Sequence, residues 1–357
     1  MNTRSSTTIL AVALASFGFA ASACAGSYVV GPPFKIAASP GAQRTPAAYG
    51  GVVVWEENNL GQTCIKGWNL TASEEVVVPH HGPQTCPAIW GDIVVWEDAR
   101  SGNPDIYGYN LSTKQELLIA GSTSAERAPS IWGDWVVWEQ SGALDTDVRA
   151  FNLTTQESVT ACSHSGQQVA PKIGDNWIVW QDLRSGAVDL YGFNLATRQE
   201  APLVTGPGER GAHGLANGVL AWETINQFGE SDISAMCLPN GTPWQVCIDP
   251  GFQFIPAVWG NLIVWGDWQE GVIGIRGYDT KTKEYLWALS PDADCTSLLS
   301  LAISGNLMVW EDASNWNSEV YGAYVSETPE PASLTALALG AIGLLGIGKL
   351  RGRKRQT

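Results

Sequence analysis

Histidine, the side chain most often used for acid–base chemistry and metal binding, occurs only four times in 357 residues. His80 and His81 are adjacent, whereas His164 and His213 stand alone. The sequence has no HExxH pair for zinc, no GxSxG turn for a nucleophilic serine and no glycine-rich phosphate loop. We therefore expect no catalytic residues and no shared metal site, and we expect these histidines to lie in separate loops facing solvent.

Acidic residues form a second candidate set, because carboxylates and loop carbonyls together bind calcium. They occur in pairs at four places: Asp98 and Asp105, Asp145 and Asp147, Asp182 and Asp189, Asp312 and Glu319. Two pairs lie in the similar segments EDARSG and QDLRSG, where an arginine follows the first Asp by two residues. The favoured interpretation is that each Asp caps a loop and pairs with Arg100 or Arg184, and calcium binding is the alternative.

Aromatic residues form the third set. Tyr49, Trp90, Trp132 and Trp259 each stand directly before a glycine and six residues before another tryptophan. Such rings, with acidic hydrogen-bond acceptors nearby, suit sugars, which have apolar faces and hydroxyl edges. The alternative is that each ring covers the seam to a neighbouring structural unit.

These spacings belong to an internal repeat. Pro stands nine residues before most members of a recurring Trp series, and Gly stands twelve residues after most of them. A period near 42 is the length of one four-stranded propeller blade. We call the repeating tryptophans the framed Trp residues: they end apolar triplets every 41 to 45 residues, at Trp55, Trp96, Trp138, Trp180, Trp222, Trp265 and Trp310.

The second repeat predicts strands over 86–90, 93–97, 105–111 and 115–120, with turn residues between them. Its second strand is apolar on both faces, which is expected of a sheet covered on both sides. The framed Trp residues are therefore interpreted as packing between blades. The seventh repeat lacks a fourth strand, and the segment 34–36 lies as far before Pro46 as the segment 117–119 lies before Pro129.

The sequence therefore predicts an all-β fold: a seven-bladed β-propeller of four-stranded blades, closed by an N-terminal strand that completes the last blade. The blade sequence is fullest in WEDARSGNPDIYGYNLSTKQE, residues 96–116. It resembles TolB-like propeller repeats and the repeats of archaeal and bacterial surface proteins, over nearly all of residues 33–325. Many TolB-like propellers have six blades, but the framed Trp residues indicate seven here.

In a propeller, the first strand of each blade would line the central channel. Tyr49, Trp90, Trp132 and Trp259 would then gather near one mouth of that channel as a ligand-binding surface for glycan. The ring of aromatics would be incomplete, because the other three blades carry Gly174, Ala216 and Ser304 at this position.

Cysteines fit an oxidising compartment, where disulfides form. Cys64 begins a third strand and Cys86 begins the next blade's first strand, so these two would lie on the same face of adjacent blades. They are the best candidates for a disulfide. Cys237 and Cys247 flank one hairpin, but the repeat places them out of register.

Both ends of the chain resemble export signals. Residues 1–25 have Arg4, an apolar run and small residues at A-x-A sites, the pattern of a secretory signal peptide for the Sec machinery. Residues 329–357 combine the motif Pro329-Glu330-Pro331, the apolar run 332–348 and a basic end. This order resembles the PEP-CTERM sorting signal of Gram-negative bacteria. The resemblance implies an exosortase partner, a transient transmembrane anchor and delivery to the cell surface or exopolysaccharide matrix.

The acidic net charge of the chain bears on which kinds of partner it can bind. The formal net charge is −15, and five of the 20 basic residues lie in the segment 349–355. We therefore expect no nucleic-acid partner for the propeller, residues 26–328, because duplex binding needs a cationic face. We expect a monomeric, non-catalytic propeller of the cell envelope or matrix that binds or scaffolds, with exopolysaccharide as the candidate ligand. A secreted enzyme acting on polysaccharide and a periplasmic assembly factor are the alternatives.

Overall fold

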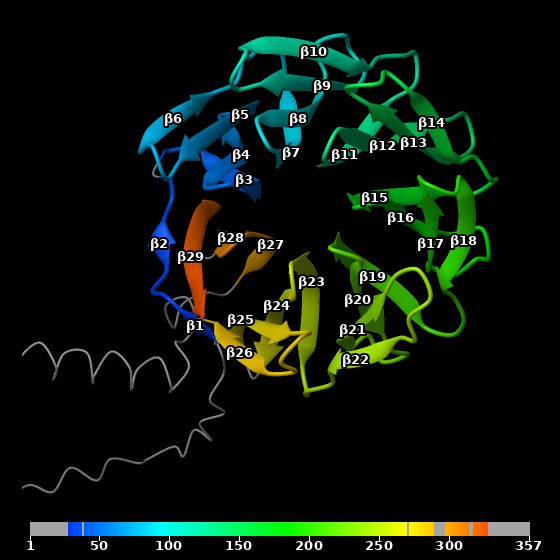
Figure 1. Ribbon diagram of the computed structural model, residues 1–357. Coiled ribbons are helices and arrows are strands. Elements are labelled where there is room, and N and C mark those ends of the chain that lie inside the picture. The colour runs from blue at the N-terminus through cyan, green and yellow to red at the C-terminus, as the bar shows by residue number, and fades with distance from the viewer. Residues whose placement is uncertain (1–27, 38, 270, 289–296, 314–316, 328–357) are drawn as a thin grey trace, which may run out of the picture.

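The computed structural model describes residues 28–37, 39–269, 271–288, 297–313 and 317–327. All regular structure in these residues is β-strand, and the strands form seven sheets arranged in a ring (Figure 1). The chain is a seven-bladed β-propeller of antiparallel blades, as the Trp repeat predicts. Among the residues so described, none forms a helix with the length and apolar character needed to cross a membrane.

Each of the first six blades has four strands that are hydrogen-bonded in chain order. The strands of blades one to three are β3 (Ala42–Tyr49), β4 (Val52–Asn59), β5 (Gln62–Asn69) and β6 (Glu74–Val77); β7 (Gln84–Trp90), β8 (Ile93–Asp98), β9 (Asp105–Asn110) and β10 (Gln115–Ala120); β11 (Glu126–Trp132), β12 (Trp135–Ser141), β13 (Thr146–Asn152) and β14 (Ser158–Cys162). Those of blades four to six are β15 (Gln168–Gly174), β16 (Trp177–Asp182), β17 (Asp189–Asn194) and β18 (Gln199–Val204); β19 (Glu209–Ala216), β20 (Val219–Ile225), β21 (Ser231–Cys237) and β22 (Trp244–Cys247); β23 (Phe252–Trp259), β24 (Leu262–Gln269), β25 (Val272–Asp279) and β26 (Tyr285–Ala288).

Blade seven is built from both ends of the described chain. Its inner strands are β27 (Leu298–Ser304), β28 (Leu307–Asp312) and β29 (Glu319–Glu327), and two N-terminal strands, β1 (Tyr28–Val30) and β2 (Phe34–Lys35), pair with β29 (Figure 1). Phe34 lies opposite Gly322, so the predicted closing strand pairs with the last blade, and Tyr28 lies opposite Glu327. This pairing closes the ring and covers the outer edge of the last blade.

The hydrophobic core is divided among the seams between blades. Trp96 packs with Val54 and Ile65 of blade one, whereas Val95, on the other face of the same strand, packs with Ile131 of blade three. The same arrangement recurs at each seam, and the framed Trp residues are between 0% and 7% exposed. The interpretation of these residues as inter-blade packing is confirmed, so the ring is stabilised mainly by apolar burial between neighbouring sheets.

A bulge interrupts the first strand of every blade, and in five blades it coincides with the repeated proline. In blade three, the pairing of β11 with β12 skips between Arg127 and Ser130, and Ala128 between them is left-handed at φ 50°. The residue before the proline is equally left-handed in four other blades, at Thr45, Cys86, Ala170 and Ile255. A non-glycine residue in this conformation costs about 1–2 kcal/mol, so each bulge needs compensating contacts.

Candidate functional site: the aromatic mouth of the central channel

The innermost strands of the blades enclose the central channel, as the sequence analysis expected. A cavity of about 320 Å³ is lined by residues from β3, β7, β11, β15, β19, β23 and β27. Two layers of side chains follow from the alternation of a strand. The upper layer, which we call the aromatic layer, consists of the residues six positions before each framed Trp, next to the first turn of each blade. The layer below it, eight residues before each framed Trp, is small except at blade four: Ala47, Ala88, Ser130, Lys172, Gly214, Ala257 and Ala302.

Four aromatic rings meet at this mouth, and we call them the aromatic mouth. The ring centroids of Trp90 and Trp132 are 4.0 Å apart, and those of Tyr49 and Trp90 are 4.6 Å apart. Trp259, on blade six, lies 5.8 Å from both Trp90 and Trp132 and 6.0 Å from Tyr49. The side chains therefore converge from four blades into one tilted cluster.

Each of the four rings is half-buried and also touches the core of a seam. Tyr49 packs against the core between blades one and two, and Trp90 against the core between blades two and three. The two interpretations of these rings are therefore not exclusive, because one edge of a ring can pack on a seam while the rest remains accessible. Ligand binding by the aromatic mouth stays a prediction.

Two basic side chains line the channel below the rings. Lys172 lies inside the channel, where its side chain is accessible to solvent but surrounded on all sides by protein. This enclosure disfavours the charged form and lowers the pKa of its amine. His213 is buried, with Nε2 3.3 Å from the carbonyl oxygen of Val179. Burial, reinforced by the charge of Lys172, lowers the pKa of His213 to about 4. His213 is therefore a neutral residue of the channel wall at neutral pH.

That position of His213 corrects the expectation that all four histidines face solvent. His213 stands where five other blades have proline, at a buried position of the first strand. The other three histidines are exposed as expected: His80 and His81 follow β6, and His164 follows β14. Within the described residues, no three His, Cys, Asp or Glu side chains are grouped to hold a metal ion.

A belt of carboxylates, which sequence reasoning missed, lies at the other end of the first strands. The Glu after the framed Trp accepts a hydrogen bond from the left-handed residue of the next blade's bulge. Ala128 N lies 2.7 Å from Glu97 Oε1, Ala170 N 2.5 Å from Glu139 Oε1, and Ile255 N 2.5 Å from Glu223 Oε1. Burial raises the pKa of Glu139 and Glu223. The signal was the dipeptide Trp-Glu, which lies within the second strand in five of the seven repeats.

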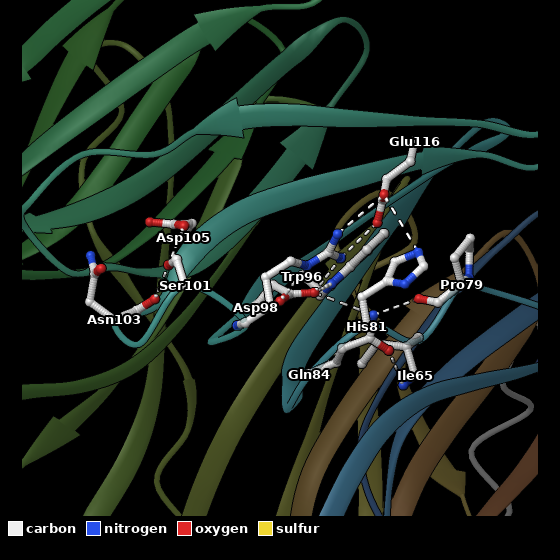
Figure 2. Close-up of polar contacts among 11 residues, drawn as sticks. Ile65, Pro79, His81, Gln84, Trp96, Asp98, Ser101, Asn103, Asp105 and Glu116 are labelled. Atoms are coloured by element: carbon white, nitrogen blue, oxygen red, sulfur yellow. Dashed lines mark hydrogen bonds and ion pairs between the residues drawn. The ribbon is translucent and has the colours of Figure 1, made fainter.

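The aspartates of the EDARSG and QDLRSG segments make the contacts that the turn interpretation predicts. Figure 2 shows those of Asp98 in EDARSG. Arg100 Nη2 lies 2.7 Å from Asp98 Oδ2 and 2.7 Å from Glu116 Oε1, and Trp96 Nε1 donates to Asp98 Oδ2 at 3.0 Å. Burial alone would raise the pKa of Asp98, but the hydrogen bonds from Arg100 and Trp96 bring it below its ordinary value. Asp182 and Arg184 repeat this arrangement in blade four. These two aspartates therefore use their oxygens within their own loops.

Cys64, on β5, and Cys86, on the adjacent blade's β7, are free thiols in the structure. Their disulfide stays a prediction about the oxidised protein. Cys247 lies opposite Ile233 and Cys237 lies opposite Val219, so the second pair is out of register as expected.

The signal peptide at 1–25 and the sorting signal at 329–357, with Pro329, Glu330 and Pro331, lie outside the described residues.

Solved structures share this fold, although no protein-family model and no curated protein matches the sequence. The β-propeller domain of the trilobed protease from Pyrococcus furiosus aligns with a TM-score of 0.63 over 83% of this chain and 98% of that domain, at 12% identity. Oligogalacturonate lyase from Vibrio parahaemolyticus aligns with a TM-score of 0.61 over 85% of this chain and 97% of the lyase, at 10% identity. TolB from Acinetobacter baumannii aligns over 65% of this chain and 58% of its own length, at 13% identity and a TM-score of 0.46.

The class that these observations define is the β-propeller. The neighbours include a lyase and a protease domain, so the shared fold does not specify an activity. The Pyrococcus propeller is described as having an open velcro topology. The ring described above differs, because β1 and β2 pair with β29 and join the two ends in blade seven.

Proposed function

We propose that this chain is an exported, non-catalytic β-propeller of the bacterial cell envelope or exopolysaccharide matrix, and that it binds glycan at the aromatic mouth. The observation that carries the proposal is the convergence of Tyr49, Trp90, Trp132 and Trp259 from four blades onto one mouth of the channel. Their tilted, half-buried rings present aromatic surface of the kind that stacks on the apolar face of a sugar.

The energy available supports a repeating polymer better than a single sugar. One aromatic contact contributes about 0.5–1.5 kcal/mol beyond its area burial, so a single ring gives weak binding. Several rings on a rigid scaffold engage successive units of one chain, which raises the apparent affinity without any new kind of contact. A matrix polysaccharide supplies such repeated units.

The test is the double variant Trp90→Ala with Trp132→Ala, measured by affinity electrophoresis in a panel of soluble polysaccharides. We expect the double variant to lose retention while its far-UV circular dichroism is unchanged. Phe228→Ala with Trp268→Ala is the matched control, because both side chains are exposed and lie at the opposite end of the second strands from the mouth, Phe228 after β20 and Trp268 near the end of β24. Full binding by a folded Trp90/Trp132 variant would refute the site, unfolding would show that the rings serve the seams, and cleavage of the polymer would favour the enzyme alternative.

Export is the second part of the proposal and rests on the two terminal patterns. The mature protein should lack residues 1–25 and the segment after about residue 331. Mass spectrometry of the surface fraction should then give propeller peptides without peptides from 332–357. Intact C-terminal peptides in that fraction would contradict processing by an exosortase.

A further inference from the structure

Blade seven interrupts the aromatic mouth and leaves two hollows beside it. Ser304 occupies the position at which four other blades carry a ring, and Gly305 follows it with φ at 61° in the turn between β27 and β28. A hollow of about 500 Å³ lies on one side of this turn, and another of about 390 Å³ lies on the other side. Trp259, Gly305 and Asn306 border both, so the two hollows are adjacent and share one aromatic wall.

Each hollow has further walls of aromatic or aliphatic side chains. Tyr28 and Leu262 border the larger one, and Tyr49 and Tyr324 border the smaller one. Tyr324 is 40% exposed, and Phe34 stacks on one side of its ring with the centroids 5.5 Å apart, so only the remaining ring surface can meet a ligand. Both hollows are within the size range of small-molecule sites, and the shared Trp259 sets them side by side.

The polar groups at these hollows are uncharged. The described residues that line them include no Asp, Glu, Lys, Arg or His, although the chain carries 35 acidic and 20 basic residues. Hydrogen bonding by side chains is left to uncharged groups: the amides of Asn261 and Asn306, the indole N–H of Trp259, and the hydroxyls of Thr71, Ser304, Ser326, Tyr28, Tyr49 and Tyr324. Lys172 belongs to the layer below the rings and lines neither hollow.

We infer that the two hollows are adjacent subsites for a neutral polysaccharide, with the chain crossing the Gly305-Asn306 turn and stacking on Trp259. Aromatic walls with amide and hydroxyl groups match the faces and hydroxyl edges of uncharged sugars. A uronate polymer would bring carboxylates to a surface that offers no cation, and would remain better solvated in water. This inference rests on the proposed function and specifies its ligand class.

The experiment compares soluble neutral polymers, a β-glucan and a galactomannan, with alginate and polygalacturonate as acidic polymers. Wild type should be retained by at least one neutral polymer and by neither acidic one. Asn306→Ala should weaken that binding by between about 2- and 10-fold, the usual effect of losing one hydrogen bond. Asn306→Lys should weaken it similarly and create binding to alginate. Asn59→Ala is the matched control, since Asn59 is exposed at the far end of β4 from the mouth.

The outcomes separate this inference from the proposed function. Binding to acidic polymers alone, or neutral binding that is lost in the Trp90/Trp132 variant but unchanged in both Asn306 variants, would overturn the subsites and leave a glycan-binding mouth in place. No retention by any polymer would overturn both. Thermal melts of each variant check that the fold is intact. We expect it to be, because the hydrogen bond of Asn306 within the blade runs from Val325 N to its backbone carbonyl and does not depend on the side chain.

Discussion

Mild acid should destabilise this propeller through His213, and replacing that histidine with leucine should remove that part of the effect. The side chain is 4% exposed and its pKa is lowered to about 4 from the ordinary value of 6.5. Leucine is the suitable replacement because Leu301 occupies the equivalent position in blade seven. The His213→Leu variant therefore keeps an apolar, uncharged wall in the channel at every pH.

The sign follows from proton linkage. Between pH 4 and pH 6.5, the unfolded chain binds a proton at His213 that the folded chain does not bind, so stability falls as the pH falls. The contribution is complete above pH 6.5 and is lost on the way down to pH 4. With a folded-state pKa of about 4, the loss between pH 7.5 and pH 4.5 is about 2.5 kcal/mol, which is a large part of the stability of an ordinary domain.

Carboxyl groups titrate in the same range and act in the opposite direction. Burial raises the pKa of Glu56, Glu126, Glu139 and Glu223, so these groups bind protons more readily when folded and favour the folded state as the pH falls toward their ordinary pKa values. The acid response of wild type alone is therefore not diagnostic. The difference between wild type and His213→Leu isolates the histidine, because the carboxyl groups are common to both.

Urea unfolding followed by tryptophan fluorescence at pH 7.5, 6.0 and 4.5 measures that difference. The free energy of unfolding of His213→Leu should decline by about 2–3 kcal/mol less than that of wild type over this range. Parallel declines would refute the reasoning, since they would show that His213 keeps an ordinary pKa and access to water.

Two further predictions concern closure and the bulges. Deleting residues 27–38 removes β1 and β2, exposes the edge of β29 and opens the ring, so we expect aggregation or a large drop in melting temperature, whereas an unchanged melt would show that these strands are dispensable. Glu97→Ala removes the acceptor that lies 2.7 Å from Ala128 N and should cost about 1–3 kcal/mol in urea unfolding. Glu97→Gln, which keeps a carbonyl acceptor, should cost less, and equal losses in the two variants would mean that the bulge does not depend on this hydrogen bond.

Much of the fold was predictable because each blade repeats residues with a strict physical role. The framed Trp residues mark buried second strands, and the match between segments 34–36 and 117–119 located the closing strand at β2. The strand β1 was not predicted, because its three residues, Tyr28–Val30, follow no repeat and carry no turn signal. Its position is set by pairing with β29, a contact between opposite ends of the described chain.

The site was predictable in position and less so in detail. A shared repeat position was sufficient to bring Tyr49, Trp90, Trp132 and Trp259 to one mouth, because identical positions in a ring face one axis. The carboxylate belt could not be predicted in the same way. Glu97 has the sequence pattern of an ordinary polar residue, and its role depends on the left-handed backbone of Ala128 in the next blade. The residue types do not predict a left-handed backbone, because Thr45, Ala128 and Ile255 all adopt it and none of them is glycine.

The antiparallel pairing of β1 with β29 also determines how this ring responds to tension. Tyr28 and Glu327 lie opposite each other, so the first residue of β1 and the last residue of β29 are neighbours at the same end of this strand pair. A force that separates these two ends loads the β1–β29 hydrogen bonds one pair at a time, from Tyr28 toward Val30, and then reaches the pairing of Phe34 and Lys35. This unzipping geometry is the weakest way to load a sheet, so the last blade should peel open at low force while the other six remain folded.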